Sequence, residues 1–206
     1  MQKEIKALII GLIVVFIVIA SIGGFIYLII VAETVERGQS SEYKLEIITN
    51  DTANYILHVP LAVNDDESVS ELMDDLHITE GKATHETIQT EHGMALKIEA
   101  NESVCLMASE TKQILRPHLS MLNDTSEDGA PDYSNLEFWL YCDKSVDSTN
   151  ITLSIHLTIE SWRDWYNGLG MHKWYSSSTR EEQIKDVTVT SGWQKVPGYI
   201  LMELAN

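Results

Sequence analysis

The segment Asn150-Ile-Thr-Leu-Ser-Ile-His-Leu-Thr-Ile159 alternates aliphatic and polar side chains without interruption. Successive side chains of a strand point to opposite faces of a sheet, so one face of this segment carries only isoleucine and leucine. It therefore predicts a β-strand with one buried and one solvated face. Residues 136–142 alternate in the same way, with Glu137, Trp139 and Tyr141 on the second face.

Further segments of strand composition lie between clusters of turn residues such as Asn50-Asp51, His92-Gly93 and Ser191-Gly192. The expected strands cover residues 43–49, 54–59, 82–90, 94–100, 104–109, 184–190 and 198–204. Eight or nine short strands with this punctuation are typical of an antiparallel β-sandwich or jelly roll. A parallel sheet is disfavoured, because its strands would be continuous apolar runs.

One short helix is expected among the strands. Ser68-Val-Ser-Glu71 has the capping-box pattern, and apolar residues follow it at helical spacing. These apolar residues are Val69, Leu72, Met73 and Leu76. The pattern predicts a helix of two to three turns that covers an edge or an end of the sheet.

An uncharged run, 26 residues long, covers residues 7–32. As a helix it would be about 39 Å long, against roughly 30 Å for the hydrocarbon core of a bilayer. The apolar region of a secretory signal peptide is shorter, about 7–15 residues. The run therefore predicts a retained transmembrane anchor that contacts membrane lipid.

The charges beside this run predict its orientation. Lys3 and Lys6 precede it, whereas Glu33 and Glu36 outnumber Arg37 after it. Positive flanks stay in the cytoplasm, so we expect a single-pass protein of the cell membrane with its N-terminus in the cytoplasm. The expected parts are a cytoplasmic head (1–6), the anchor (7–32), a polar stalk (33–41) and one extracellular β-sandwich domain (42–206). Gly38 is expected to end any helix that continues from the anchor into the stalk.

Composition narrows the classes of partner. The chain has 206 residues, 31 acidic and 14 basic side chains, and a net charge of −17. A nucleic-acid partner is disfavoured, since binding it needs a basic surface. Charged residues make up 22% and hydrophobic residues 44%, which is not the composition of a disordered acidic chain.

Four Asn-x-Ser/Thr sequons agree with export and predict glycosylation, although unused sequons also occur in polar chains. The acceptor residues are Asn50, Asn101, Asn123 and Asn150. Cys105 and Cys142 are the only cysteines, and an even number in an exported chain predicts a disulfide. Such a bridge would close a loop of about 37 residues and stabilise the fold by roughly 3–4 kcal/mol. Two unpaired buried thiols are the alternative.

Residues 124–135 resemble the calcium loop of EF-hand and dockerin-type sites, with Gly129 at the sixth position. Pro131 and the amide at the twelfth position depart from that pattern. The candidate calcium ligands are Asp124, Ser126, Asp128, Asp132 and Asn135. The alternative is a solvated acidic turn, and no other cofactor is expected.

Aromatic residues gather towards the C-terminus, where all five tryptophans lie. Exposed rings in a loop could stack on a sugar or anchor a protein partner, whereas packing against an open end of the sandwich explains most of them equally simply. The candidate binding residues are Trp162, Trp165, Tyr166 and Trp174.

Catalytic signatures are mostly absent from the sequence. It contains no Gly-x-Ser-x-Gly elbow, no phosphate-binding loop with lysine and no His-Glu-x-x-His pattern. Its seven histidines are scattered, with no pair at metal-ligand spacing on one expected element. We therefore expect a structural, adhesion or partner-binding protein of the cell envelope rather than an enzyme.

Two alternatives use the N-terminal run differently. Lys6-Ala7-Leu8-Ile9 before the apolar run resembles the processing site of archaeal type IV prepilins. That resemblance implies a filament subunit with a helical core and an outward-facing β-rich head. Gly23-Gly24 would instead allow close helix contact in an accessory subunit of a membrane complex.

Overall fold

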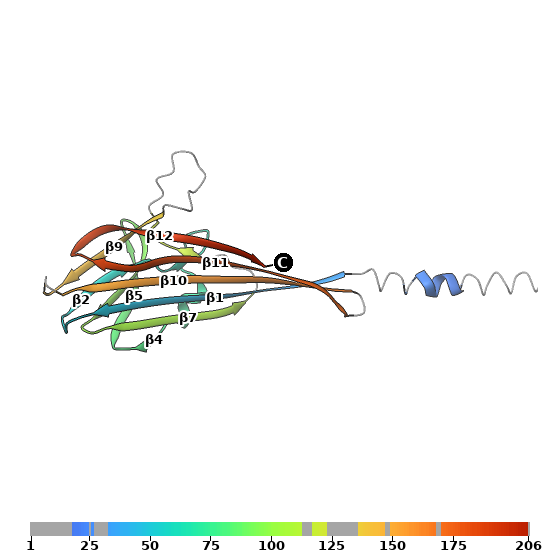
Figure 1. Cartoon of the computed structure of the whole chain (residues 1–206), viewed down its shortest axis with the longest axis horizontal. Coiled ribbons are helices and arrows are strands. Elements are labelled where there is room, and N and C mark those ends of the chain that lie inside the picture. The colour runs from blue at the N-terminus through green and yellow to red at the C-terminus, as the bar shows by residue number, and fades with distance from the viewer. Residues whose placement is uncertain are drawn as a thin grey trace, which may run out of the picture. The chain divides into compact units, whose positions relative to one another are not determined.

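The computed structural model describes residues 18–24, 26, 33–112, 117–122, 136–146, 149–167 and 170–205 (Figure 1). Most of this chain is β-strand, and its elements follow the expected alternation of buried and exposed side chains. The elements are β1 (Glu33–Thr49), β2 (Tyr55–Val59), β3 (Ala62–Val63), a 3₁₀ helix η1 (Glu71–Asp75), β4 (His77–Glu80), β5 (Ala83–Thr90), β6 (Gly93–Ala100), β7 (Val104–Lys112), β8 (His118–Leu119), β9 (Leu136–Lys144), β10 (Ile151–Asn167), β11 (His172–Val189) and β12 (Gly192–Ala205).

Ten of these strands form one sheet in the order β4-β7-β1-β10-β11-β12-β9-β2-β6-β5, and β3 pairs with β8 in a separate ribbon. The registers seen between neighbours are antiparallel. The predicted antiparallel, mainly β architecture is therefore confirmed. The described strands form one continuous sheet, however, and not two separate layers.

Strand β12 makes the sheet continuous by changing its partner half-way. Its first half, from Gly192 to Gly198, pairs with β9, and its second half, from Tyr199 to Ala205, pairs with β11. The change occurs at Pro197-Gly198, where a Cβ on Gly198 would lie 2.2 Å from Cε2 of Phe138. Only glycine leaves room there for the buried Phe138 ring.

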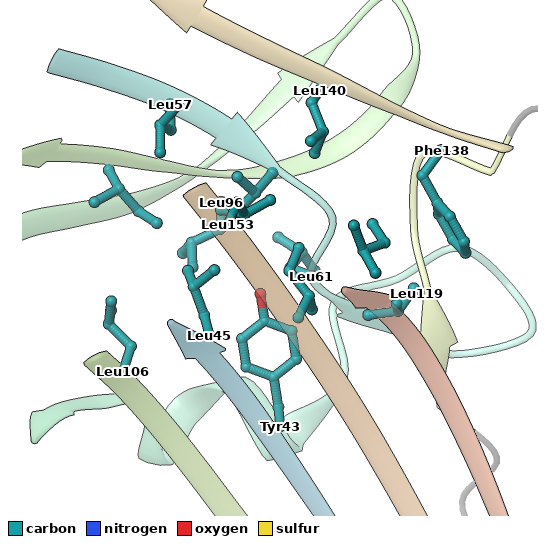
Figure 2. Close-up of a cluster of buried hydrophobic side chains, with 14 of the residues drawn as sticks. Tyr43, Leu45, Leu57, Leu61, Leu96, Leu106, Leu119, Phe138, Leu140 and Leu153 are labelled. Atoms are coloured by element: carbon teal, nitrogen blue, oxygen red, sulfur yellow. The ribbon is translucent and has the colours of Figure 1, made fainter. Parts of the chain in front are cut away.

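The curled sheet encloses an apolar core. Figure 2 shows leucines from strands far apart in the sheet order, such as Leu45 on β1 and Leu96 on β6, gathered around one interior. Tyr43 is fully buried among them, and its hydroxyl donates a 2.7 Å hydrogen bond to the carbonyl oxygen of Pro60. Burying these side chains, at about 25 cal/mol per Å² of apolar surface, is the main stabilisation of the fold.

The chain divides into two compact units, which are described separately. Residues 38–162 and 177–205 form the core unit, which holds the apolar core. Residues 33–37 and 163–176 belong to the second, the tip unit.

The expected helix is shorter than predicted. The structure has only the 3₁₀ helix Glu71–Asp75, which is capped by the Ser70 hydroxyl and not by Ser68. Val69 forms a β-bridge with Val63, and the N–H of Ser70 donates to Ala62. The backbone at Val69 and Ser70 is extended, and strand β4 begins at His77. Little more than one helical turn fits between them.

The N-terminal region lies mostly outside the described residues. Residues 18–24 and 26 are helical, and within the described chain no helix has the length and apolar character needed to cross a membrane. Residues 33–41, expected as a stalk, belong to strand β1. Gly38 lies within that strand, where the absence of a side chain leaves room for the indole of Trp162 on β10.

The expected disulfide is wrong. Cys105 and Cys142 are both free thiols, the first half-buried and the second buried. They lie on β7 and β9, which are not neighbours in the sheet. Cys142 faces the core, whereas Cys105 alternates with the buried residues Val104 and Leu106 and so points to the other face. An even count of cysteines could not reveal this difference in facing.

Candidate functional site

A row of aligned side chains crosses the outer face of five strands. The registers place Glu86 on β5 opposite Lys97 on β6, Lys97 opposite His58 on β2, His58 opposite Tyr141 on β9, and Tyr141 opposite Trp193 on β12. Directly opposed side chains on one face lie about 4.5–5.5 Å apart at Cβ and therefore interact. The row places two charges beside three rings.

The rings in this row contact one another. His58 stacks on Tyr141 with their centroids 4.8 Å apart, and Tyr141 lies 5.2 Å from Trp193. The edge of His58 meets Trp193 at 6.0 Å. These separations are within the range of favourable aromatic pairs. All three side chains remain partly exposed.

A second set of rings extends the same face. His92, in the turn between β5 and β6, stacks on Trp139 at 4.0 Å and meets Trp193 edge-on at 4.6 Å. The ammonium of Lys195 lies 5.1 Å from the centre of the Trp139 ring, a cation–π distance. We call these six residues the aromatic cluster: His58, His92, Trp139, Tyr141, Trp193 and Lys195.

Charged groups border the aromatic cluster. Lys97 Nζ bonds to Glu86 at 2.8 Å and to Glu99 at 2.7 Å, and these hydrogen bonds raise the pKa of Lys97 above its usual value. The bond from Lys97 also lowers the pKa of Glu86. These three residues, with Thr84 and His85, line a shallow hollow of about 240 Å³ beside His58. Its walls offer both hydrogen-bond donors and acceptors.

His58 is uncharged in this setting. Partial burial lowers its pKa, and the positive charge of Lys97 lowers it further. Its Nδ1 is buried and has no hydrogen-bond partner among the described residues. These surroundings favour the neutral imidazole, which stacks on Tyr141.

The aromatic residues expected from the sequence occupy other places. Trp162 covers Gly38 on the neighbouring strand. In the tip unit Trp165 stacks on Trp174 at 3.6 Å, and Tyr166 meets His172 edge-on at 5.5 Å. Packing thus accounts for Trp162, while Trp174 remains 49% exposed. The expected loop is in fact the paired ends of β10 and β11.

Three sequons meet at one end of strand β1. Asn50 Oδ1 accepts a 3.0 Å hydrogen bond from the backbone N–H of Asn150, and the Ser103 hydroxyl of the Asn101 sequon accepts one of 2.9 Å from Thr49. Asn50, Asn101 and Asn150 are all exposed, as glycosylation requires. Asn123 lies outside the described residues. Glycosylation of all four sequons stays a prediction.

The candidate calcium loop also lies outside the described residues, from Asp124 to Asn135. Among the residues that the structure does describe, no group of three histidine, cysteine or acidic side chains could hold a metal ion.

One sign of the aromatic cluster is present in the sequence itself. Trp139 and Tyr141 lie on the outer, polar face of β9, whose inner face is buried. Large aromatic rings that gather on a solvent-exposed face indicate a binding surface. Their neighbours His58 and Trp193 come from strands whose register only the fold reveals.

No family model, curated protein or solved structure matches the chain. The chemistry of the aromatic cluster itself indicates which ligands it can bind. Flat rings stack on the C–H faces of sugars, because the ring faces carry partial negative charge. The amine, imidazole and carboxylate groups beside them can bond to hydroxyls.

Proposed function

We propose that this chain is a membrane-anchored cell-surface protein whose β-domain binds carbohydrate through the aromatic cluster. The cross-strand row from Glu86 to Trp193 carries the proposal, because it joins stacked rings to a pair of charged side chains on one exposed face. The hollow beside Lys97 and Glu99 gives a sugar ring room next to the aromatic surface.

Carbohydrate is favoured over a protein partner by the mixture of groups. Hot spots for proteins are dry and centred on large anchors, with charged residues depleted from the middle. Here charge reaches the rings themselves, since Lys195 lies over Trp139 and Lys97 is directly opposite His58. A polyhydroxylated ligand uses both kinds of contact.

The membrane anchor rests on the sequence. Residues 7–32 are uncharged and long enough to span a bilayer. The lysine-bearing head favours a cytoplasmic N-terminus, which would place residues 33–206 outside. Exposed sequons at Asn50, Asn101 and Asn150 support that orientation. Protease added to whole cells should then digest the chain beyond residue 33, and full protection would contradict the orientation.

The binding proposal is tested by probing the detergent-solubilised full chain on an array of neutral and acidic oligosaccharides. We expect Trp193→Ala and Tyr141→Ala to weaken binding at least about fivefold, since a stacked base or ring contributes about 1–3 kcal/mol. Tyr199→Ala is the matched control, because Tyr199 is 49% exposed on the same strand but outside the cluster. Equal binding by all three variants would contradict the proposal.

The filament subunit is the second candidate. Strand β1 begins at Glu33, directly after the apolar run, so no separate stalk joins the run to the sheet. A direct connection of this kind would limit the motion of the head relative to a helical core. N-terminal sequencing that begins at Leu8 would favour the filament, and an intact Met1 would exclude that processing.

A further inference from the structure

Exposed aromatic and apolar side chains gather where β10 and β11 end in the tip unit. Met171, Trp174 and Tyr175 are 57%, 49% and 48% exposed, and Trp174 stacks on the half-buried Trp165. We call residues 163–167 and 170–176 the hairpin tip. A patch of exposed aromatic rings is typical of a surface that contacts a partner or a membrane interface, where the rings are partly shielded from water.

The pairing of β1 with β10 places the hairpin tip beside the start of β1. Gly38 faces Trp162, the Ser40 hydroxyl donates to Glu160 at 3.5 Å, and Asn150 N–H donates to the side chain of Asn50. In each of these pairs the two residue numbers add up to 200, so the strands run antiparallel in one register. Continued along the strands, this register sets Glu33 opposite Asn167.

This position is also the end of the apolar run, which finishes at residue 32. Trp165 lies two residues from Asn167, and Trp174 lies two residues from the start of β11. At about 3.3 Å per residue, both rings are about 7 Å along the strands from the level of Glu33. The headgroup layer on each side of a bilayer is about 5–8 Å thick.

We propose that the hairpin tip inserts Trp165, Trp174 and Tyr175 into the headgroup layer of the membrane that residues 7–32 span. This inference rests on the membrane anchor of the proposed function. Tryptophan and tyrosine favour this layer, because one part of each ring system is apolar and another can hydrogen-bond to water or headgroups. The ends of β10 and β11 thereby form a second contact with the bilayer beside the anchor.

Charge does not oppose the same partner. The whole chain carries −17, whereas the tip unit is balanced, with Arg37, Arg163 and Lys173 against Glu33, Glu36 and Asp164. Nε2 of His172 lies 3.2 Å from Oδ1 of Asp164, within hydrogen-bond distance. A segment without net charge is not repelled by anionic headgroups, as the rest of this acidic chain would be.

The test uses the full chain reconstituted into liposomes of phosphatidylcholine with a minority of phosphatidylglycerol. Some of the lipids carry a nitroxide quencher either near the headgroup or near the end of the acyl chain. We expect the headgroup-proximal nitroxide to quench tryptophan emission more strongly than the deep one. Trp165→Phe/Trp174→Phe should lower this quenching at least about threefold, because it removes the interfacial indoles.

The matched control is Trp139→Phe/Trp193→Phe, which removes two indoles from the aromatic cluster and should not lower the quenched fraction of the remaining emission. Circular dichroism verifies that both double variants keep the fold. Liposome flotation distinguishes a failure of the hairpin contact from a failure of the membrane anchor. A chain that floats but shows no lipid quenching, or equal quenching in both double variants, overturns the hairpin contact alone. A chain that does not float overturns the anchor and the inference together.

Discussion

At the scale of single residues, Gly38 allows β1 and β10 to pack closely, because it has no side chain in the way of Trp162. A Cβ at this position would lie 1.9 Å from Cζ2 of Trp162, so the indole would have to move. We expect Gly38→Ala to destabilise the fold by about 1–3 kcal/mol, the usual effect of overpacking. Urea unfolding measures this loss, with Ser40→Ala on the same strand as control. An equal stability of the two variants would contradict the close contact.

His58 predicts a dependence of stability on pH. Burial lowers its folded pKa below the unfolded value of about 6.5, so the unfolded chain binds the proton more tightly. The neutral imidazole therefore stabilises the fold above that value, and this contribution is lost as the pH falls through the folded pKa. In His58→Phe the free energy of unfolding should fall less than in the natural chain when the buffer changes from neutral to mildly acidic. His85→Phe, which replaces an exposed histidine, is the control and should keep the pH profile of the natural chain. If His58→Phe also kept that profile, the assignment to His58 would be contradicted.

The two thiols should differ in reactivity. Burial raises the pKa of Cys142 to about 11, so little thiolate forms at neutral pH. In the native chain we expect a maleimide to label the half-buried Cys105 well before Cys142. After unfolding without reductant both should react, which mass spectrometry counts directly. Failure of both thiols to react in the unfolded chain would indicate a disulfide after all.

At the scale of elements, a charged pair on β11 supports the small ribbon of β3 and β8. The carboxylate of Glu182 is buried, pairs with Arg180 and accepts a 2.7 Å hydrogen bond from the N–H of Leu119 on β8. Arg180→Met would leave that charge without its partner. We expect a loss of about 2 kcal/mol, below the 3–5 kcal/mol of a fully buried pair because Arg180 is 31% exposed. Arg180→Met/Glu182→Gln should recover part of it, and a neutral single variant would contradict the role.

Elements with one buried face could be predicted from the sequence, and elements that depend on their neighbours could not. The alternation in residues 151–159 and 136–142 fixed β10 and β9, because side-chain facing is a local property. The extension of β1 through Gly38 depends on Trp162, more than a hundred residues away. The aromatic cluster likewise requires the cross-strand registers of β2, β9 and β12, which no local pattern contains.

At the scale of the whole molecule, the continuous sheet should make the core unit unfold as one body. Strand β12 pairs with β9 through one half and with β11 through the other, so neither part of the sheet can separate without breaking it. The inner faces also share one apolar core, to which Leu45 on β1 and Leu96 on β6 both contribute. Common burial of this kind gives cooperative, two-state unfolding.

Urea unfolding of the detergent-solubilised chain tests this cooperation with two probes. In a variant whose other tryptophans, Trp162, Trp165 and Trp174, are replaced by phenylalanine, emission reports on Trp139 and Trp193 of the aromatic cluster. Far-ultraviolet circular dichroism reports on all strands. We expect the two transitions to coincide. Leu45→Ala should shift both by the same free energy, about 3–4 kcal/mol, because it opens a cavity in the shared core although Leu45 lies far from β9 in the strand order. If Leu45→Ala shifted the circular dichroism transition and left the emission transition in place, the strands would fold as two independent layers, and the change of partner along β12 would have no energetic role.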